Sequence, residues 1–196
     1  MARTPSTMPE LGMHAPDFAL PDAVSGRTVR RSDYTAPPAL LVMFVCNHCP
    51  FVKHVRDQLA VLGREYQARG VAAIAISSND VASHPDDSPE LMKREAADAG
   101  YTFPYLYDES QEIAKAYRAA CTPDFFLFDR QLRLFYRGQL DASRPSKYLD
   151  GRHIASDGRD LRDALERLLT GESAPQPQLP SLGCNIKWKP GNEPGY

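Results

Sequence analysis

The sequence predicts a single α/β domain built on a central mixed sheet with helices on both faces. A length of 196 residues and a mass of 21.8 kDa suit one domain of this kind. Two continuous apolar runs, at residues 39–45 and 71–76, are typical of central parallel strands that are covered on both faces. A helical pattern separates these runs, and a later antiparallel pair of strands makes the sheet mixed.

The N-terminal half is predicted to hold a hairpin and then a strand–helix–strand unit. Residues 18–20 and 28–30 are short extended segments around a turn at Ser25-Gly26, which predicts a β-hairpin. After the strand at 39–45, apolar residues recur at helical spacing until Gly70, which predicts one amphipathic helix. These residues are Val52, Val55, Leu59, Leu62 and Tyr66.

The C-terminal half is predicted to alternate helices and strands before an extended tail. We expect helices over 88–99, 110–119 and 160–169, and strands over 103–106, 124–128 and 132–136. Residues 171–196 contain five Pro and four Gly. We therefore place the domain at residues 1–171, hairpin included, and expect residues 172–196 to form a Pro/Gly-rich tail packed on it.

Charge and hydropathy exclude several classes of protein. Lys+Arg 23 against Asp+Glu 25 gives a net charge of −2, which gives nucleic-acid binding no electrostatic support. No apolar run approaches the roughly 20 residues that span a bilayer, and residues 1–14 lack the apolar stretch of a secretory signal. We therefore expect a cytoplasmic protein that binds neither nucleic acid nor membrane, while its oligomeric state stays open.

Cysteine carries the main functional signal. The chain has Cys46, Cys49, Cys121 and Cys184, which we expect to be reactive or metal-binding rather than structural. The first two form a Cys-x-x-Cys pair between a buried strand and a helix. A helix N-terminus favours an anion, and a protonated His48 adds positive charge. We therefore expect Cys46 to be exposed with a lowered pKa, and Cys49 to be partly covered.

Two chemistries use such a pair of cysteines. In disulfide exchange, a more acidic Cys46 stabilises the reduced form, so His48 would tune the reduction potential more than the attack rate. The alternative is a copper- or zinc-binding module that uses Cys46, His48 and Cys49. Structural zinc needs four ligands, and no second Cys-x-x-Cys or His pair with zinc spacing follows. We favour disulfide exchange, with no metal and no organic cofactor.

Beyond the dithiol, several stretches of the chain carry a recognisable pattern. They are APDFALPD at 15–22, VMFVCNHCPFV at 42–52, AISSND at 75–80, PDDSP at 85–89, ACTPDFFLFD at 120–129 and GCNIKWK at 183–189. Together they resemble the peroxiredoxin-like (AhpC/TSA-type) branch of the thioredoxin superfamily, in its Cys-Asn-His-Cys subgroup.

This resemblance implies a thioredoxin fold with extra segments at both ends. It implies that Cys46 is the nucleophile and Cys49 the resolving thiol, and that Thr122–Pro123 is a cis peptide facing them. A cis proline there would hold the preceding backbone groups outward, where a substrate strand can pair. The sequence alone equally allows an ordinary trans proline at the start of a strand.

Two departures from the family pattern shape the expected activity. Met43 lies three residues before Cys46, where a peroxiredoxin carries the threonine that activates peroxide, and the strand at 39–45 has no acidic residue. His48 is then the only nearby candidate proton acceptor. We expect a thiol-disulfide oxidoreductase that acts on protein or small-molecule disulfides and has a reducing partner such as thioredoxin or glutathione. The alternative is an antioxidant thiol peroxidase that reduces hydroperoxides.

The remaining cysteines and histidines have weaker signals. Cys121, two residues before Pro123, is either an auxiliary thiol near the dithiol or a small buried hydrophobe. Cys184 is either an unreactive thiol in a packed tail or a thiol that folds back over the site. His14, His84 and His153 have no partner spacing and are expected to be solvated.

Overall fold

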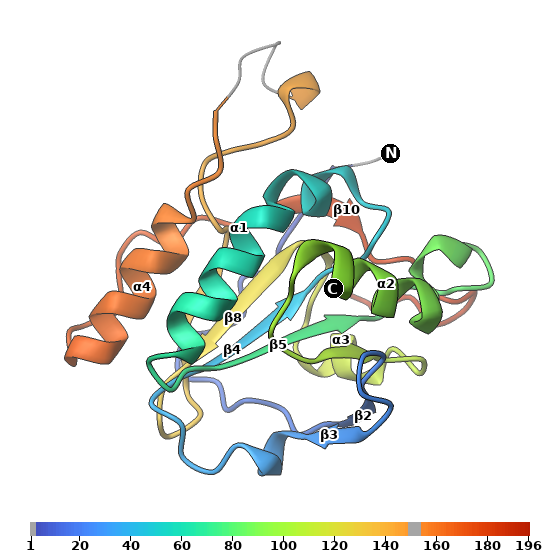
Figure 1. Cartoon of the computed structure of the whole chain (residues 1–196). Coiled ribbons are helices and arrows are strands. Elements are labelled where there is room, and N and C mark those ends of the chain that lie inside the picture. The colour runs from blue at the N-terminus through green and yellow to red at the C-terminus, as the bar shows by residue number, and fades with distance from the viewer. Residues whose placement is uncertain (1–2, 149–153) are drawn as a thin grey trace.

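A computed structural model describes residues 3–148 and 154–196, and its centre is a five-stranded sheet (Figure 1). The strand order is β6-β5-β4-β8-β9. The bounds are β4 Leu40–Phe44, β5 Ala72–Ser77, β6 Tyr105–Tyr107, β8 Asp124–Phe128 and β9 Leu134–Gly138. Strands β4, β5 and β6 run parallel, whereas β8 and β9 run antiparallel to their neighbours. The predicted mixed sheet is confirmed.

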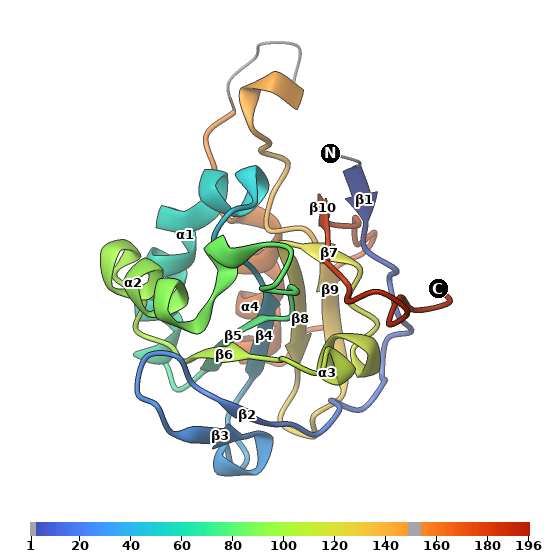
Figure 2. The same cartoon turned by 90° about the vertical axis from the view of Figure 1, so that its right-hand side faces the viewer.

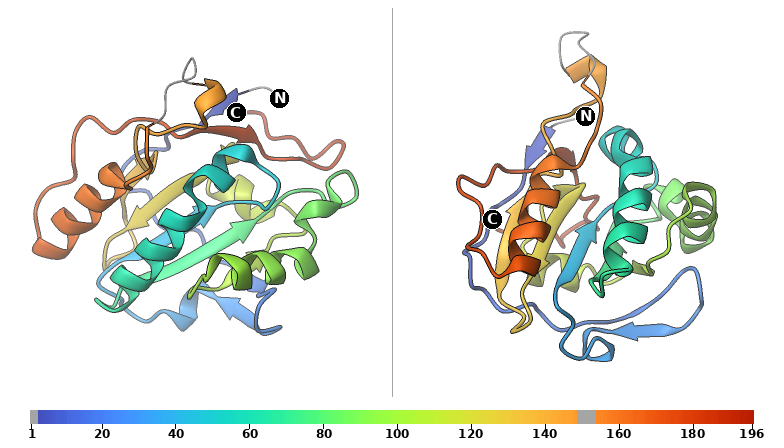
Figure 3. Two further views of the ribbon diagram at one scale, coloured as in Figure 1. Left: turned by 45° about the horizontal axis from the view of Figure 1, so that its top comes forward. Right: turned by 60° about the vertical axis from the view of Figure 1, so that its left-hand side comes forward.

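Helices cover both faces of this sheet, as the sequence predicts. The helices are α1 (Pro50–Gln67), α2 (Pro89–Ala99), α3 (Glu112–Ala116) and α4 (Arg159–Thr170), with 3-10 turns η1 (Arg31–Asp33), η2 (Pro85–Asp87) and η3 (Ser146–Tyr148). Leu41 and Met43 of β4 share one apolar core with α1, α2 and α4 (Figure 3). Leu40 and Val42, on the other face of the same strand, share a second core with α3 and the N-terminal hairpin. Strand β4 is buried on both faces for this reason.

The predicted N-terminal hairpin is present as β2 (Ala19–Pro21) and β3 (Thr28–Arg30). It joins the edge of the central sheet through Asp22, which pairs with Leu106 and accepts a 3.0 Å hydrogen bond at Oδ1 from the backbone N–H of Tyr105. Figure 2 shows the hairpin beneath β6. The hairpin therefore extends the fold on the edge away from β9.

The C-terminal tail is more ordered than the sequence suggests. Strand β10 (Leu182–Asn185) lies between β1 (Arg3–Pro5) and β7 (Cys121–Thr122) in a separate antiparallel sheet (Figure 2). These strands are two to four residues long, which is too short to show the alternation of apolar and polar residues that predicts a strand. The two ends of the chain thus meet beside the start of β8.

Three predicted elements differ in extent or position. The helix expected over 110–119 shortens to Glu112–Ala116, because Gln111 and Arg118 adopt positive φ values of 65° and 55°. The strand expected over 103–106 lies at Tyr105–Tyr107, and the strand expected over 132–136 lies at Leu134–Gly138. Within the described residues, no helix combines the length and the apolar character needed to cross a membrane.

Candidate active site

The dithiol lies where β4 gives way to α1. Helix α1 begins at Pro50, a residue favoured at the first helical position, and Cys49 is its N-cap. Cys46 therefore lies in the connecting loop, one turn before the helix. Cys46 is 1% exposed and Cys49 is 0% exposed, so the predictions of an exposed Cys46 and a partly covered Cys49 are both wrong. All four cysteines are in the thiol form.

Cys46 contacts polar groups from two directions. Its Sγ lies 3.4 Å from the Thr122 hydroxyl and 3.9 Å from Nδ1 of His48, and it shares a hydrogen bond with Cys49. Thr122, on strand β7, thus places a hydroxyl beside Cys46. The sequence analysis looked for this hydroxyl at residue 43, which is a methionine. Sequence spacing cannot find this contact, because Thr122 lies 76 residues further along the chain.

Charge within the pair is distributed opposite to the expectation. Burial raises the pKa of Cys46, and its hydrogen bond with Cys49 adds to the rise. Hydrogen bonds from Cys184 and from Cys46 lower the pKa of Cys49. The helix dipole acts in the same direction at this N-cap position. The raised pKa of Cys46 corrects the prediction of a lowered one.

The backbone of Thr122 holds Cys49 from the other side. Its carbonyl oxygen lies 3.2 Å from the Cys49 Sγ and accepts a hydrogen bond from the protonated thiol. The Thr122–Pro123 peptide is cis, as the family resemblance implies, and it faces the dithiol. Thr122 therefore touches Cys46 with its hydroxyl and Cys49 with its carbonyl group.

A buried carboxylate that the sequence analysis missed lies behind the dithiol. Oδ2 of Asp87, in η2, lies 2.6 Å from Nδ1 of His48 and 2.7 Å from Nδ2 of Asn79. Oδ1 accepts hydrogen bonds from the backbone N–H groups of Asn47 (2.8 Å) and His48 (3.2 Å). Burial acts to raise the pKa of Asp87, but the hydrogen bonds from His48 and Asn79 outweigh it, so the pKa is lowered.

Only an indirect signal for Asp87 is present in the sequence. It belongs to the PDDSP stretch that carries part of the family resemblance, but its neighbour Asp86 is exposed and no pattern separates the two. His84, expected to be solvated, instead stacks on His48 at a ring-centroid distance of 4.9 Å. His14 is exposed as expected, and His153 lies outside the described residues.

Strand β10 covers the dithiol. Cys184 pairs with Thr122 in the ladder, is 2% exposed, and hydrogen bonds to Cys49. Of the two alternatives for Cys184, the structure shows the thiol folded back over the site. The backbone edge of Thr122, where a substrate strand was expected, is occupied by this chain's own β10.

Cys121 is buried on the neighbouring strand position. Its Sγ lies 3.8 Å from the carbonyl oxygen of Pro123, and burial with the charge of Asp124 raises its pKa well above the ordinary value. Successive residues of a strand point to opposite faces, so Cys121 points away from the face that Thr122 shares with Cys184. The structure thus favours the interpretation of Cys121 as a small buried hydrophobe.

One set of potential metal ligands lies within the described residues. Cys46, His48 and Asp87 offer ligand atoms within 4.8 Å of one another, so Asp87 takes the place that the sequence analysis assigned to Cys49. A metal ion here would have to break the 2.6 Å contact between His48 and Asp87. The hydrogen bonds already made favour thiol chemistry over metal binding.

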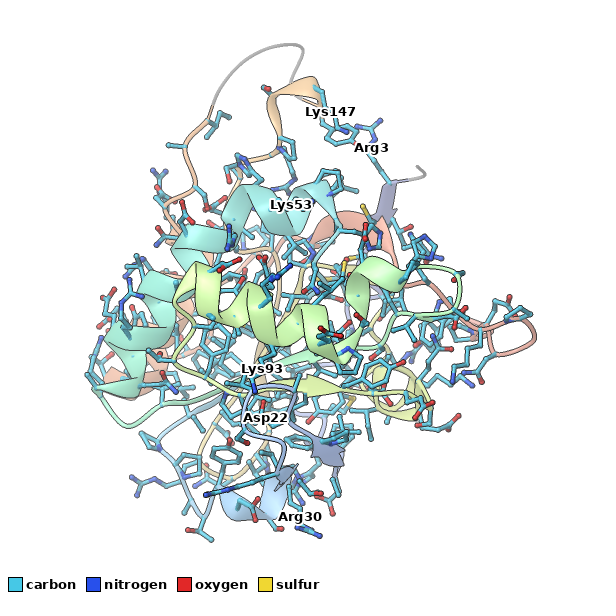
Figure 4. The ribbon with its side chains drawn as sticks, turned by 45° about the vertical axis from the view of Figure 1, so that its right-hand side comes forward. Arg3, Asp22, Arg30, Lys53, Lys93 and Lys147 are labelled. Atoms are coloured by element: carbon cyan, nitrogen blue, oxygen red, sulfur yellow. The ribbon has the colours of Figure 1, made fainter. Side chains whose placement is uncertain are left out.

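The end of the molecule that holds the dithiol carries basic side chains at its rim. Figure 4 shows Arg3, Lys53 and Lys147 toward one end, with Asp22 and Arg30 toward the other. Lys53 lies one turn after Cys49 on α1, and Arg3 pairs with Cys184 in the β1–β10 ladder. The pocket beside His48 is lined by Lys53 and Arg94 and by the carboxyl groups of Asp86, Glu95 and Asp98, so both signs of charge lie there.

Comparison with known proteins assigns this architecture to a family. Residues 11–137, which include the dithiol and the cis proline, match the AhpC/TSA family. The chain belongs to the AhpC/TSA family. It is also 28% identical over 130 residues to the thiol-disulfide oxidoreductase ResA from Geobacillus thermodenitrificans. The aligned region covers 65% of this chain and 68% of that protein.

Solved structures extend the comparison of this AhpC/TSA member over nearly the whole chain. An uncharacterized conserved protein from Geobacillus kaustophilus is 52% identical with a TM-score of 0.92, covering 97% of this chain and 98% of that one. A hypothetical protein from Sinorhizobium meliloti 1021 is 46% identical with a TM-score of 0.91, and the match covers 96% of this chain and 100% of that one. Peroxidoxin BcpB from Mycobacterium tuberculosis is 16% identical with a TM-score of 0.58, and the match covers 82% of this chain and 96% of that one. Like these neighbours, the chain has the thioredoxin fold.

Proposed function

We propose that this protein is a thiol-disulfide oxidoreductase that exchanges disulfides through Cys46 and Cys49. The observation that supports this most directly is that one residue touches both thiols. The Thr122 hydroxyl lies 3.4 Å from Sγ of Cys46, and the Thr122 carbonyl oxygen lies 3.2 Å from Sγ of Cys49, at the N-terminus of α1. The two sulfur atoms therefore lie around the same residue, where they can form a disulfide. The buried carboxylate, the cis proline and the AhpC/TSA membership support the same activity.

The proposed reaction begins at Cys46, whose Sγ faces His48. The Cys46 sulfur attacks one sulfur of a substrate disulfide and forms a mixed disulfide, and the proton of Cys46 ends on the first substrate thiol, which leaves. The Cys49 sulfur then attacks the Cys46 sulfur, and the proton of Cys49 ends on the second substrate thiol. The products are the Cys46–Cys49 disulfide and the second substrate thiol, and the reverse sequence oxidises a dithiol.

His48 and Asp87 are proposed to position and balance charge for this exchange. Nδ1 of His48 faces both the Cys46 Sγ at 3.9 Å and Oδ2 of Asp87 at 2.6 Å. A protonated imidazole held by Asp87 stabilises a thiolate on Cys46 at the moment of attack. The sequence analysis found only His48 as a polar partner for the dithiol, and the structure adds Asp87 to it.

Substrates are proposed to be protein or small-molecule disulfides, with thioredoxin or glutathione as the reducing partner, in the cytoplasm. The pocket beside His48 holds Lys53 and Arg94 together with three carboxyl groups, which suits a disulfide that carries both amino and carboxyl groups. Oxidised glutathione carries both and is therefore a suitable probe. Because Cys46 is buried, access requires movement of the segments that cover it.

The test measures catalysed exchange between oxidised glutathione and a dithiol, for the wild-type protein and three single variants. Cys46→Ser should abolish the catalysed rate, and Cys49→Ser should accumulate a mixed disulfide with glutathione at Cys46. Cys121→Ser is the matched control, because it removes a buried thiol that points away from the dithiol, and it should retain the rate. A wild-type rate equal to that of Cys46→Ser would overturn the proposal.

A thiol peroxidase is the second candidate function. The observation that favours it is the Thr122 hydroxyl 3.4 Å from the Cys46 Sγ, since a hydroxyl beside the reactive sulfur is what peroxide activation needs. Burial and the raised pKa of Cys46 act against rapid attack on peroxide. Stopped-flow measurement of hydrogen peroxide consumption separates the two functions, because a rate constant no greater than that of free cysteine excludes the peroxidase.

A further inference from the structure

The C-terminal strand β10 lies where the backbone of Thr122 would otherwise bind a substrate strand. Cys184 is the residue of β10 that pairs with Thr122, and Asn185 pairs with Cys121. An extended peptide that binds such an edge contributes main-chain hydrogen bonds, and one of its side chains faces the site. In this molecule that side chain is a thiol. Strand β10 therefore occupies the position of a bound cysteine-containing peptide.

The contact between β10 and Thr122 is unusually close. A Cβ atom added to Gly183 would lie 2.0 Å from the carbonyl oxygen of Thr122. That same oxygen lies 3.2 Å from the Cys49 Sγ. Glycine at position 183 thus lets β10 approach the one backbone group that also touches the dithiol, and it brings the next residue, Cys184, to the dithiol.

Three thiols consequently gather around Thr122. The Thr122 hydroxyl lies 3.4 Å from Sγ of Cys46, and its carbonyl oxygen lies 3.2 Å from Sγ of Cys49. Cys184 pairs with Thr122, and residues paired in an antiparallel ladder point to the same face, so the Cys184 side chain lies on the face that holds Cys46. A hydrogen bond from Cys184 also lowers the pKa of Cys49. All three side chains are buried, at 1% (Cys46), 0% (Cys49) and 2% (Cys184) exposed. A disulfide on Cys49 can therefore be made with either neighbour, without contact with solvent.

We propose that Cys184 is a third redox-active thiol, which takes the disulfide over from Cys46 by attacking Cys49. The inference rests on the proposed function, which supplies the Cys46–Cys49 disulfide. In the step, the Cys184 sulfur bonds to the Cys49 sulfur as the Cys46–Cys49 bond breaks, and the proton of Cys184 ends on Cys46. One disulfide is exchanged for another, so no external oxidant or reductant is needed.

This exchange moves the disulfide that a reducing partner must attack from Cys46–Cys49 to Cys49–Cys184. With the disulfide at Cys46–Cys49, β10 is held only by non-covalent contacts. With the disulfide at Cys49–Cys184, β10 is bonded to the first turn of α1, and Cys46 is a thiol again. The reducing partner then has to attack from the side of the C-terminal strand.

Tryptic peptides distinguish the two disulfides directly. Cys46 and Cys49 lie in one peptide, 32–53, whereas Cys184 lies in 168–187 and Cys121 in 119–130. A Cys46–Cys49 disulfide stays inside one peptide, and a Cys49–Cys184 disulfide links two. The experiment oxidises the reduced protein with oxidised glutathione, blocks free thiols in acid at timed intervals, and maps the peptides under non-reducing conditions.

The proposal expects the internal disulfide first and the link between 32–53 and 168–187 afterwards. The link should disappear in Cys184→Ser and in Cys49→Ser, and it should persist in Cys121→Ser, the matched control. Cys46→Ser should still form the link, since Cys49 and Cys184 remain. Absence of the link from the wild-type protein overturns the proposal, whatever Cys46→Ser forms.

The same experiment separates this inference from the proposed function. If wild-type protein forms the internal disulfide and never the link, the oxidoreductase proposal stands and the role of Cys184 fails. If the internal disulfide never forms in wild-type protein, the proposed function fails. A link in Cys46→Ser would then show only that Cys49 and Cys184 can be joined, and the proposed transfer would be overturned as well.

Discussion

Nδ1 of His48 lies 2.6 Å from Oδ2 of Asp87, a carboxylate with no exposed surface. The same carboxylate accepts hydrogen bonds from two backbone N–H groups of the loop that carries the dithiol. Asp87 therefore does two things: it fixes the path of the Cys46–Cys49 loop, and it holds the imidazole beside Cys46. Each role can be tested separately.

The substitution Asp87→Asn tests the structural role. The amide presents a donor where Asn79 and His48 also donate, so we expect the free energy of unfolding at pH 7 to fall by about 1–3 kcal/mol. Because the folded-state pKa of Asp87 is lowered, its contribution is present above the unfolded value of about 3.9 and is lost as the pH falls below it. The difference between variant and wild type should therefore shrink in acid.

Urea unfolding at pH 7 and at pH 3 measures this effect. Asp86→Asn is the matched control, because Asp86 is the exposed neighbour in the same turn. We expect it to leave the urea midpoint unchanged. Equal midpoints for Asp87→Asn and Asp86→Asn at pH 7 would show that the buried carboxylate contributes nothing.

The substitution His48→Ala tests the electrostatic role. A protonated His48 stabilises a thiolate on Cys46, and hence the reduced form of the pair. Loss of about 1.4 kcal/mol of that stabilisation makes the reduction potential of the pair more negative by about 30 mV. Equilibration with mixtures of oxidised and reduced dithiothreitol measures the shift. The exposed His14 provides the control His14→Ala, and a potential that stays the same or rises in His48→Ala would contradict the prediction.

Asp124 predicts the opposite pH dependence to Asp87. It is fully buried directly after Pro123, and burial raises its pKa well above the ordinary value. A carboxyl with a raised folded-state pKa contributes full stability below the unfolded value of about 3.9, and that stability is lost as the pH rises toward the folded-state pKa. Asp124→Asn keeps the shape and removes the titration. The variant should therefore be more stable than wild type at pH 8. The difference should be about 1.4 kcal/mol for each pKa unit by which burial raises the folded-state pKa of Asp124, counted from about 3.9 up to pH 8.

Urea midpoints at pH 4 and pH 8 check this prediction. The advantage of Asp124→Asn should be present at pH 8 and largely gone at pH 4. The exposed Asp98 on α2 provides the control Asp98→Asn, which should track wild type at both values. A variant that is less stable than wild type at pH 8 would mean that the ionised carboxylate is held by its hydrogen bonds.

The central part of the fold is predictable because its signals are local. Strands β4 and β5 are continuous apolar runs, α1 has a clear apolar stripe, and the cis peptide before Pro123 is implied by the family resemblance. The dithiol is predictable for the same reason, since both cysteines lie in one short motif. Features encoded within a short stretch of residues are thus the ones that the sequence predicts correctly.

The surroundings of the dithiol are set by contacts between distant segments, which the sequence does not reveal. Asp87 reaches the loop from 39 residues away, and Thr122 reaches Cys46 from 76 residues away. Strand β10 has only four residues and no alternation of apolar and polar side chains, and its place beside Thr122 depends on a glycine that allows close approach. The burial of Cys46 and its raised pKa result from contacts of this kind, which is why the sequence predicts both wrongly.

The substitution Gly183→Ala tests whether β10 controls access to the dithiol. The added methyl group would lie 2.0 Å from the carbonyl oxygen of Thr122, so the strand must shift away from β7. Overpacking of this kind costs about 1–3 kcal/mol. Each 1.4 kcal/mol raises the population with β10 detached about tenfold. We therefore expect Cys46 and Cys49 to react with a thiol reagent about fivefold to a hundredfold faster than in the wild-type protein.

The control for this effect lies in the same tail. Gly195 has no atom within 4 Å of an added Cβ, so Gly195→Ala changes the residue without a clash. It should leave the rate of thiol modification unchanged. The rates are followed by mass spectrometry of peptide 32–53 in the reduced protein, which reports on Cys46 and Cys49 and on neither of the other cysteines. If Gly183→Ala and Gly195→Ala react at the same rate, the dithiol opens by another route, and the loop around η2 becomes the segment that must move.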